Sequence, residues 1–314
     1  MNLSEQMDFI NKIEADFPVE SWTIDGIHIW PLVRTSLGTH LAYTEIGKSI
    51  DNTQGYLPNK IAKLINLMKG HADYIRAYVS DFSNNARINQ KVDAVFLGEQ
   101  VTRVGLNKFW YDRFCDPLID EFKANGMKFL NIERLHSYCI PRYSPSHYIQ
   151  PKLDYFLVKS IVTCKKSDYF NVKLDDYELF QNIIDEYDMR FMLSFNQLIR
   201  SFYRLRLCAD FFKKILQRVE AKIGFVVCYY GLEGMAFNLA CREMGIPSVD
   251  IQHGVQGDLH FAYGRWNNLP EAGYELLPSF FWVWSEVEAR AIDKWNGIVK
   301  QWHQPYIGGN PWLN

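Results

Sequence analysis

The chain has 314 residues, of which 48% are hydrophobic and 22% charged, a composition typical of a globular protein long enough for two domains or one large one. A formal net charge of −2 argues against a general nucleic-acid binder, because that role usually needs a basic surface. The six cysteines contain no CxxC pair, which predicts reduced, mostly buried thiols rather than a disulfide framework or a zinc site.

The N-terminus and the hydropathy of the chain predict a cytoplasmic protein. Residues 1–17 are acidic and interrupted by polar positions, so they do not form a signal peptide. No uninterrupted apolar run approaches the roughly 18 residues that a membrane span needs.

The first 90 residues predict mainly helices. Apolar side chains recur at helical spacing over 9–17, and Pro18 ends that pattern. A second helix is expected to open at Pro31 and a third to span 60–79. The asparagine-rich stretch 80–90 is a predicted connector.

From Val92 the pattern changes to alternating strands and helices. Apolar runs that predict buried parallel strands occupy 92–98, 127–132, 225–230, 246–251 and 280–284. Helices are predicted over 117–125, 191–220, 235–244 and 286–295, the last one capped by Ser285. This order predicts an α/β fold, a Rossmann-like parallel sheet flanked by helices over 91–310, after a helical segment over 1–90. The stretch 103–112 is expected to be a polar loop, and 134–185 gives no clear pattern.

The predicted helix over 191–220 carries a basic face. Its cations are Arg200, Arg204, Arg206, Lys213, Lys214 and Arg218. Two interpretations stay open: a solvated helix face, or a surface that contacts anionic phospholipid or a lipid-phosphate acceptor.

The most informative stretch runs from Phe225 to Gln256, in the order strand, turn, helix, turn, strand. The second strand leads directly into Gln252, His253 and Gly254. Ligands of open parallel sheets collect outside the carboxyl ends of the strands. We therefore expect the functional site at this strand end.

Three segments carry a resemblance to a known family: LACREMGIPSVDIQHGV (239–255), LPSFFWVWSE (277–286) and IGGNPW (307–312). Together with the leader IDGIHIWPLVR (24–34), they resemble the N-terminal Rossmann-like half of GT-B glycosyltransferases of bacterial capsule and O-antigen assembly. The resemblance extends from about Val92 to the C-terminus. It implies a second Rossmann-like domain that holds most nucleotide-sugar contacts, with 311–314 as the start of the linker to it.

The resemblance implies a nucleotide-sugar-dependent, inverting transferase for bacterial surface polysaccharide such as lipopolysaccharide, with this chain as the acceptor-side domain. It further implies a glycan or lipid-linked acceptor and no metal cofactor. The net charge already argues against a nucleic-acid partner, and the predicted cytoplasmic protein would contact the inner face of the membrane peripherally. Such a transfer needs a base that titrates near neutral pH, and His253 fits by position. The alternative is a histidine that only hydrogen-bonds loop backbone.

Other strand ends supply further candidates. Glu99 follows the first strand and is the alternative base, and Arg103 is a candidate phosphate or carboxylate binder. Glu233 lies in the second strand-to-helix turn, where a helix N-terminus favours an anion; it is a candidate substrate-binding residue, with helix capping or solvent exposure as the alternative. The sequence GEQVTRVG (98–105) does not match GxGxxG, so an NAD role has little support.

Four residues near the QHG sequence have open roles. His260 and Tyr263 are expected on a loop that borders the site, with packing as the alternative. Trp266 either stacks on a sugar ring or packs in the core. Asp250 either orients a neighbouring base or forms a structural salt bridge, since a buried acid needs a partner.

Two functions of other classes stay open. One is a non-catalytic glycan-binding or assembly module, and the other is a protein related to sugar-nucleotide epimerases, which share the two-domain architecture. Transfer of sugar to an added acceptor distinguishes the transferase from both.

Overall fold

The computed structural model describes residues 1–50, 90–134, 139–164, 172–187, 193–297 and 301–313. The helix predicted over 60–79 and nearly all of the predicted connector lie outside these ranges.

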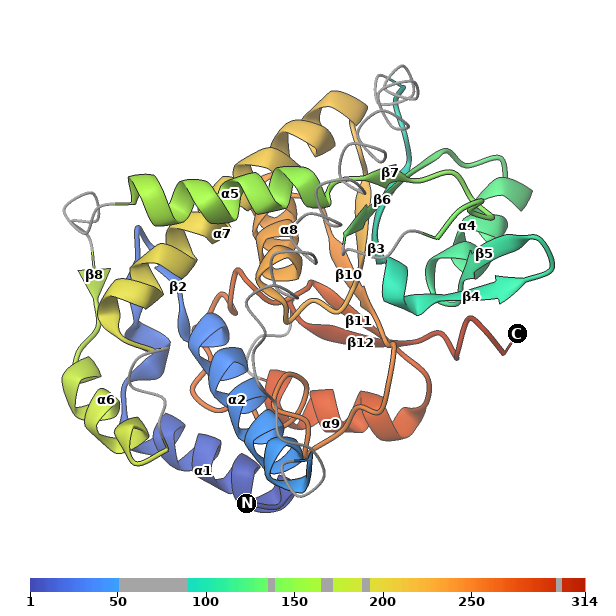
Figure 1. The fold of residues 1–314 in the computed structure, drawn as a ribbon. Coiled ribbons are helices and arrows are strands. Elements are labelled where there is room, and N and C mark those ends of the chain that lie inside the picture. The colour runs from blue at the N-terminus through green and yellow to red at the C-terminus, as the bar shows by residue number, and fades with distance from the viewer. Residues whose placement is uncertain (51–89, 135–138, 165–171, 188–192, 298–300, 314) are drawn as a thin grey trace.

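A seven-stranded parallel sheet forms the centre of the fold (Figure 1). Its strands are β3 (Ala94–Glu99), β6 (Phe129–Arg134), β7 (His147–Tyr148), β9 (Ile223–Val227), β10 (Ser248–Ile251), β11 (Phe280–Val283) and β12 (Gln304–Ile307). They lie in the order β12-β11-β10-β9-β3-β6-β7, so the chain builds outward from β3 in one direction and then from β9 in the other. This doubly wound order confirms the predicted Rossmann-like fold.

Helices cover both faces of the sheet, as the alternation of buried side chains along β3 requires. Val95 and Leu97 belong to a large core with α7 (Phe195–Val219) and α8 (Leu232–Glu243). Phe96 faces the other way, stacks on Phe225 with ring centroids 4.8 Å apart, and packs with α4 (Cys115–Ala124). The last helix, α9 (Glu286–Asn296), has the predicted cap, because the Ser285 side chain accepts a hydrogen bond from the Val287 amide.

The predicted polar loop over 103–112 is wrong. After a short 3-10 turn (Gln100–Thr102), β4 (Arg103–Leu106) and β5 (Phe109–Asp112) form an antiparallel hairpin. The three consecutive aromatic residues of β5 favour an extended strand.

The segment without a clear pattern contains α5 (Gln150–Thr163), β8 (Val172–Lys173) and α6 (Tyr177–Asp185). The helical repeat of apolar residues in α5 is not visible in the sequence because the outward face of the helix is also apolar, with Tyr155, Val158 and Val162 exposed. The basic face of α7 pairs in part with α8: Arg204 binds Glu233, while Arg206 and Lys213 bind Glu243.

The N-terminal elements pack against the main core rather than apart from it. They are α1 (Leu3–Asp16), a 3-10 turn (Val19–Ser21), β1 (Thr23–Ile24), β2 (Ile27–His28) and α2 (Trp30–Ile50). An Asn2–Glu5 capping box begins α1, and α2 has Pro31 in its first turn, as predicted. The strand β1 pairs with both β2 and β8.

A buried ion pair fixes these helices to the loop that follows β10. Arg34 of α2 binds Glu14 of α1, and both side chains are fully buried. The remaining donors of Arg34 reach the backbone oxygens of Phe261 (2.8 Å) and Gly264 (2.6 Å). Glu14 also accepts hydrogen bonds from the Trp30 indole (2.7 Å) and the Asn267 amide (3.1 Å).

Removing one member of this pair leaves the other charge buried. We expect Arg34→Met to lower the free energy of unfolding by about 3–5 kcal/mol, measured by urea denaturation. The matched control is Lys12→Met, which breaks an exposed α1 pair with Asp16 and is expected to cost less than about 1 kcal/mol. Equal effects of the two substitutions would contradict the assignment.

Candidate functional site

The strand order reverses between β3 and β9, and the carboxyl ends of β9 and β10 meet beside that point. Tyr230 follows β9 and His253 follows β10. Their side chains meet, with 3.2 Å between the Tyr230 hydroxyl and His253 Nε2. The structure therefore places the predicted His253 at the carboxyl ends of the central strands, where ligands of such folds collect.

The backbone sets the tautomer of His253. Its Nδ1 lies 3.2 Å from the carbonyl oxygen of Ile251, and a carbonyl only accepts, so Nδ1 carries the hydrogen. The neutral ring then has its lone pair on Nε2, which accepts the Tyr230 O–H. Burial lowers the pKa of His253 below its usual 6.5, and the charge of Arg134 acts in the same direction. Near neutral pH, His253 is an unprotonated base.

His260 lies against the same tyrosine. Its ring centroid is 5.5 Å from that of Tyr230, and its Nδ1 accepts the amide N–H of Ala262 at 3.1 Å. Burial lowers the pKa of His260 to about 4, and the proximity of His253 acts in the same direction. Phe114, at the foot of the β4–β5 hairpin, contacts His253 from another side, with centroids 6.4 Å apart.

A row of alternating charges crosses the neighbouring strand ends. Arg134, the last residue of β6, pairs with Glu99 at the end of β3 and lies 3.8 Å from Glu233 at the start of α8. Glu233 pairs in turn with Arg204 of α7. The anion that we expected at this helix N-terminus is thus the protein's own carboxylate.

Arg134 also fixes the end of β9. Its guanidinium donates to the backbone oxygens of Val227 (2.9 Å) and Cys228 (2.8 Å). Cys228 has φ 63, a conformation that costs energy for a residue with a side chain. A Cβ on Gly234 would lie 2.6 Å from the Cys228 and Tyr229 carbonyl oxygens, so this tight turn requires glycine there. The strain is located beside the candidate site.

Asp250 supports the cluster around His253, which consists of Tyr230, His253, His260 and Phe114. Its carboxylate accepts the Tyr229 amide at 3.0 Å and the Tyr263 hydroxyl at 2.9 Å. Asp250 and Tyr263 are both buried, so Tyr263 holds the strand end in place and does not line an open surface. Burial raises the pKa of Asp250 to about 8, because it disfavours the charged form more than the two donors favour it.

Gln252 and Gly254 shape the loop around His253. The buried Gln252 amide accepts the Trp284 N–H at 2.7 Å and donates to the Gly254 oxygen at 2.9 Å, which fixes the loop to the end of β11. A Cβ on Gly254 would meet nothing within 4 Å, so this backbone borders open space.

Arg103 lies apart from this cluster, in a buried group of charges under the hairpin. It binds Glu133, lies 3.4 Å from Asp116, and donates to the Trp110 oxygen at 2.7 Å. Trp266 is likewise buried, with the Arg34 guanidinium 4.2 Å from its ring centroid.

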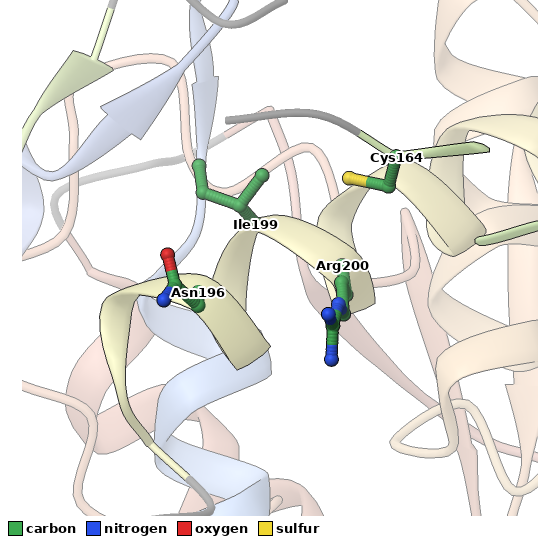
Figure 2. A pocket seen from close by; sticks show the side chains of 4 residues that line it. All are labelled: Cys164, Asn196, Ile199 and Arg200. Carbon is green, nitrogen blue, oxygen red and sulfur yellow. The ribbon is translucent and has the colours of Figure 1, made fainter. Parts of the chain in front are cut away.

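A separate hollow of about 200 Å³ lies between the end of α5 and the first turns of α7 (Figure 2). It is lined by Cys164, Asn196, Ile199 and Arg200. None of these four residues belongs to the cluster around His253.

No group of three or more His, Cys, Asp or Glu side chains in the described ranges is arranged to hold a metal ion. None of the described helices combines the length and apolar character that crossing a bilayer requires.

Sequence reasoning missed two residues of this site, Tyr230 and Arg134. The apolar run over 225–230 predicts Tyr230 only as the end of a strand, and the strand predicted over 127–132 ends before Arg134. The signal for Arg134 was available, since a basic residue at the end of a buried strand must find acceptors there.

Comparison with known proteins gives no match for this chain among protein-family models, curated proteins or solved structures.

The pKa of Asp250 predicts a pH dependence of stability. With a folded pKa of about 8 and an unfolded value of about 3.9, the folded state binds the extra proton between these values. This contribution therefore falls as pH rises, by up to about 1.4 kcal/mol per pH unit. Asp250→Asn removes it; the asparagine oxygen can still accept the Tyr229 amide, and its NH2 group can donate to the Tyr263 hydroxyl oxygen. We expect Asp250→Asn to become more stable relative to wild type from pH 5 to 8, measured by urea unfolding; parallel curves would contradict the shift.

Proposed function

We propose that the chain is the acceptor-side domain of an inverting GT-B glycosyltransferase of bacterial surface polysaccharide assembly. The observation that carries the proposal is the neutral His253, held by Ile251 at the carboxyl end of β10 with Nε2 directed to Tyr230. The doubly wound sheet and the sequence resemblance add support. A second Rossmann-like domain would bring the nucleotide sugar, and the acceptor would be a glycan, free or lipid-linked at the inner face of the membrane.

In the proposed reaction, the acceptor hydroxyl replaces the Tyr230 hydroxyl at His253 Nε2. His253 takes the proton as the acceptor oxygen attacks the anomeric carbon, and the bond to the nucleoside diphosphate breaks. The Nδ1–H bond to Ile251 keeps the ring in the tautomer that this step needs. His253 is preferred to Glu99 as the base because the Glu99 carboxylate is held in its ion pair with Arg134.

A glycan-binding module without catalysis is the second candidate. The observation that favours it is the Tyr230 hydrogen bond, which already occupies the lone pair of Nε2. Tyr230→Phe distinguishes the two. If His253 is the base, Tyr230→Phe frees its Nε2 and transfer activity is kept or increased. A binding module transfers no sugar with either tyrosine or phenylalanine at position 230.

The base role predicts a large loss of rate in His253→Gln, because glutamine accepts a hydrogen bond but not a proton at neutral pH. We expect kcat for sugar transfer to fall about 10²- to 10⁴-fold. The assay uses the protein as its gene encodes it, with a panel of nucleotide sugars and synthetic glycan acceptors. The control is His28→Gln, which changes a histidine that pairs with Glu275 outside the cluster. Unaltered turnover in a folded His253→Gln protein would exclude the assignment.

The lowered pKa of His253 predicts the pH profile. Transfer needs the neutral ring, and its population decreases as pH falls through the folded pKa, which lies below 6.5. We therefore expect kcat/KM to be flat near neutral pH and to decline only below about pH 6.5. A decline that begins above pH 7 would assign the profile to another group.

A further inference from the structure

An aromatic surface stands beside the cluster around His253. It consists of Phe109 and Tyr111 on β5, Tyr143, and Trp312 after β12. Tyr143 lies 6.5 Å from Phe109 and 4.8 Å from Tyr111, measured between ring centroids. Trp312 lies 5.6 Å from Tyr111. We refer to these four side chains as the aromatic face.

Three separate parts of the chain build the aromatic face. The hairpin β4–β5 is extended by 141–143, since Trp110 N–H donates to the Pro141 oxygen at 2.8 Å and Tyr143 N–H to the Trp110 oxygen at 3.0 Å. The C-terminal tail follows β12, which is one edge strand of the sheet, and runs toward the hairpin (Figure 1). The Trp282 indole holds the tail through the Gly309 oxygen at 2.9 Å.

Three of the four rings of the aromatic face are open to solvent, and Tyr111 is partly buried. Phe109 is 46% exposed, Tyr143 42% and Trp312 40%. Polar groups border them: Asp120 accepts the Tyr143 hydroxyl at 3.0 Å and pairs with Lys123 at 2.9 Å, and both are partly exposed. The surface therefore combines flat apolar rings with a charged donor and acceptor.

The aromatic face and the candidate site are joined by a short stretch of chain. Phe114, which contacts His253, follows Tyr111 by three residues. Three residues span at most about 11 Å. An oligosaccharide of several residues on the aromatic face is therefore long enough to extend to the Tyr230–His253 pair.

We propose that the aromatic face binds sugar rings of the glycan acceptor next to the residue that reacts at His253. The C–H bonds on the face of a pyranose carry partial positive charge and are attracted to the negative face of an aromatic ring. The hydroxyls at the edge of the sugar suit Asp120 and Lys123. This inference rests on the proposed function, and it names the part of the site that binds the acceptor.

The test is ligand-observed NMR titration of the full chain with tri- to hexasaccharides of glucose, galactose, mannose and N-acetylglucosamine. We expect at least one oligosaccharide to bind, and Phe109→Ala and Trp312→Ala to weaken that binding about tenfold each. The matched control is Trp110→Ala. Trp110 is 37% exposed on the same strand, but alternation places it on the other side of the hairpin, so its loss should leave binding unchanged. Urea unfolding of each variant verifies the fold.

Three results would overturn the proposal: no oligosaccharide binds the wild-type chain, Trp110→Ala weakens binding as much as Phe109→Ala, or the aromatic-face variants change only the oligomeric state. The last result would make these rings an interface between copies. His253→Gln separates this proposal from the proposed function. If His253→Gln binds the saccharide normally and the wild-type protein transfers no sugar, the aromatic face stands as a glycan site while the transferase assignment fails.

Discussion

Arg34 and Glu14 pair without any contact with solvent, and that pair holds the loop that packs beside the candidate site. Arg34 holds the backbone of the loop after β10, and the same loop supplies Tyr263. Tyr263 binds Asp250, and Asp250 binds the amide of Tyr229 at the end of β9. A continuous series of bonds thus joins the N-terminal helices to the strand end that carries Tyr230. The N-terminal helices before β3 therefore help to hold this strand end in place.

A second group of charges, centred on Arg134, also supports the carboxyl end of β9. Arg134 connects the ends of β3, β6 and β9, three strands that are distant in the sequence. Because the guanidinium is 4% exposed, its ion pair with Glu99 acts in a medium of low dielectric constant, where it is stronger than at a surface. Held in this way, the β9 end tolerates the unfavourable φ of Cys228.

Local patterns predicted five of the seven strands of the sheet and most of its helices, because each of these is one apolar run or one helical period; β7 and β12 were not predicted in this way. They also predicted that His253 follows a buried strand, which the doubly wound order places at the ligand-binding edge. The β4–β5 hairpin and α5 were missed because both present apolar side chains to solvent, against the rule by which periodicity is read. Arg134 and Tyr230 depend on which strands lie side by side. That information is not in any single segment, and it is also why the sequence could not assign Tyr263 to Asp250.

The cysteine at the strained end of β9 gives the protein a built-in reporter of local opening. Burial raises the pKa of Cys228 to about 12, so in the closed molecule almost no thiolate is present for an alkylating reagent. Cys228 is only partly exposed, and we expect its alkylation to be slow while Arg134 holds the strand end. Faster alkylation of Cys228 therefore reports a more loosely held strand end, in the same way that faster amide exchange reports the opening of a hydrogen bond.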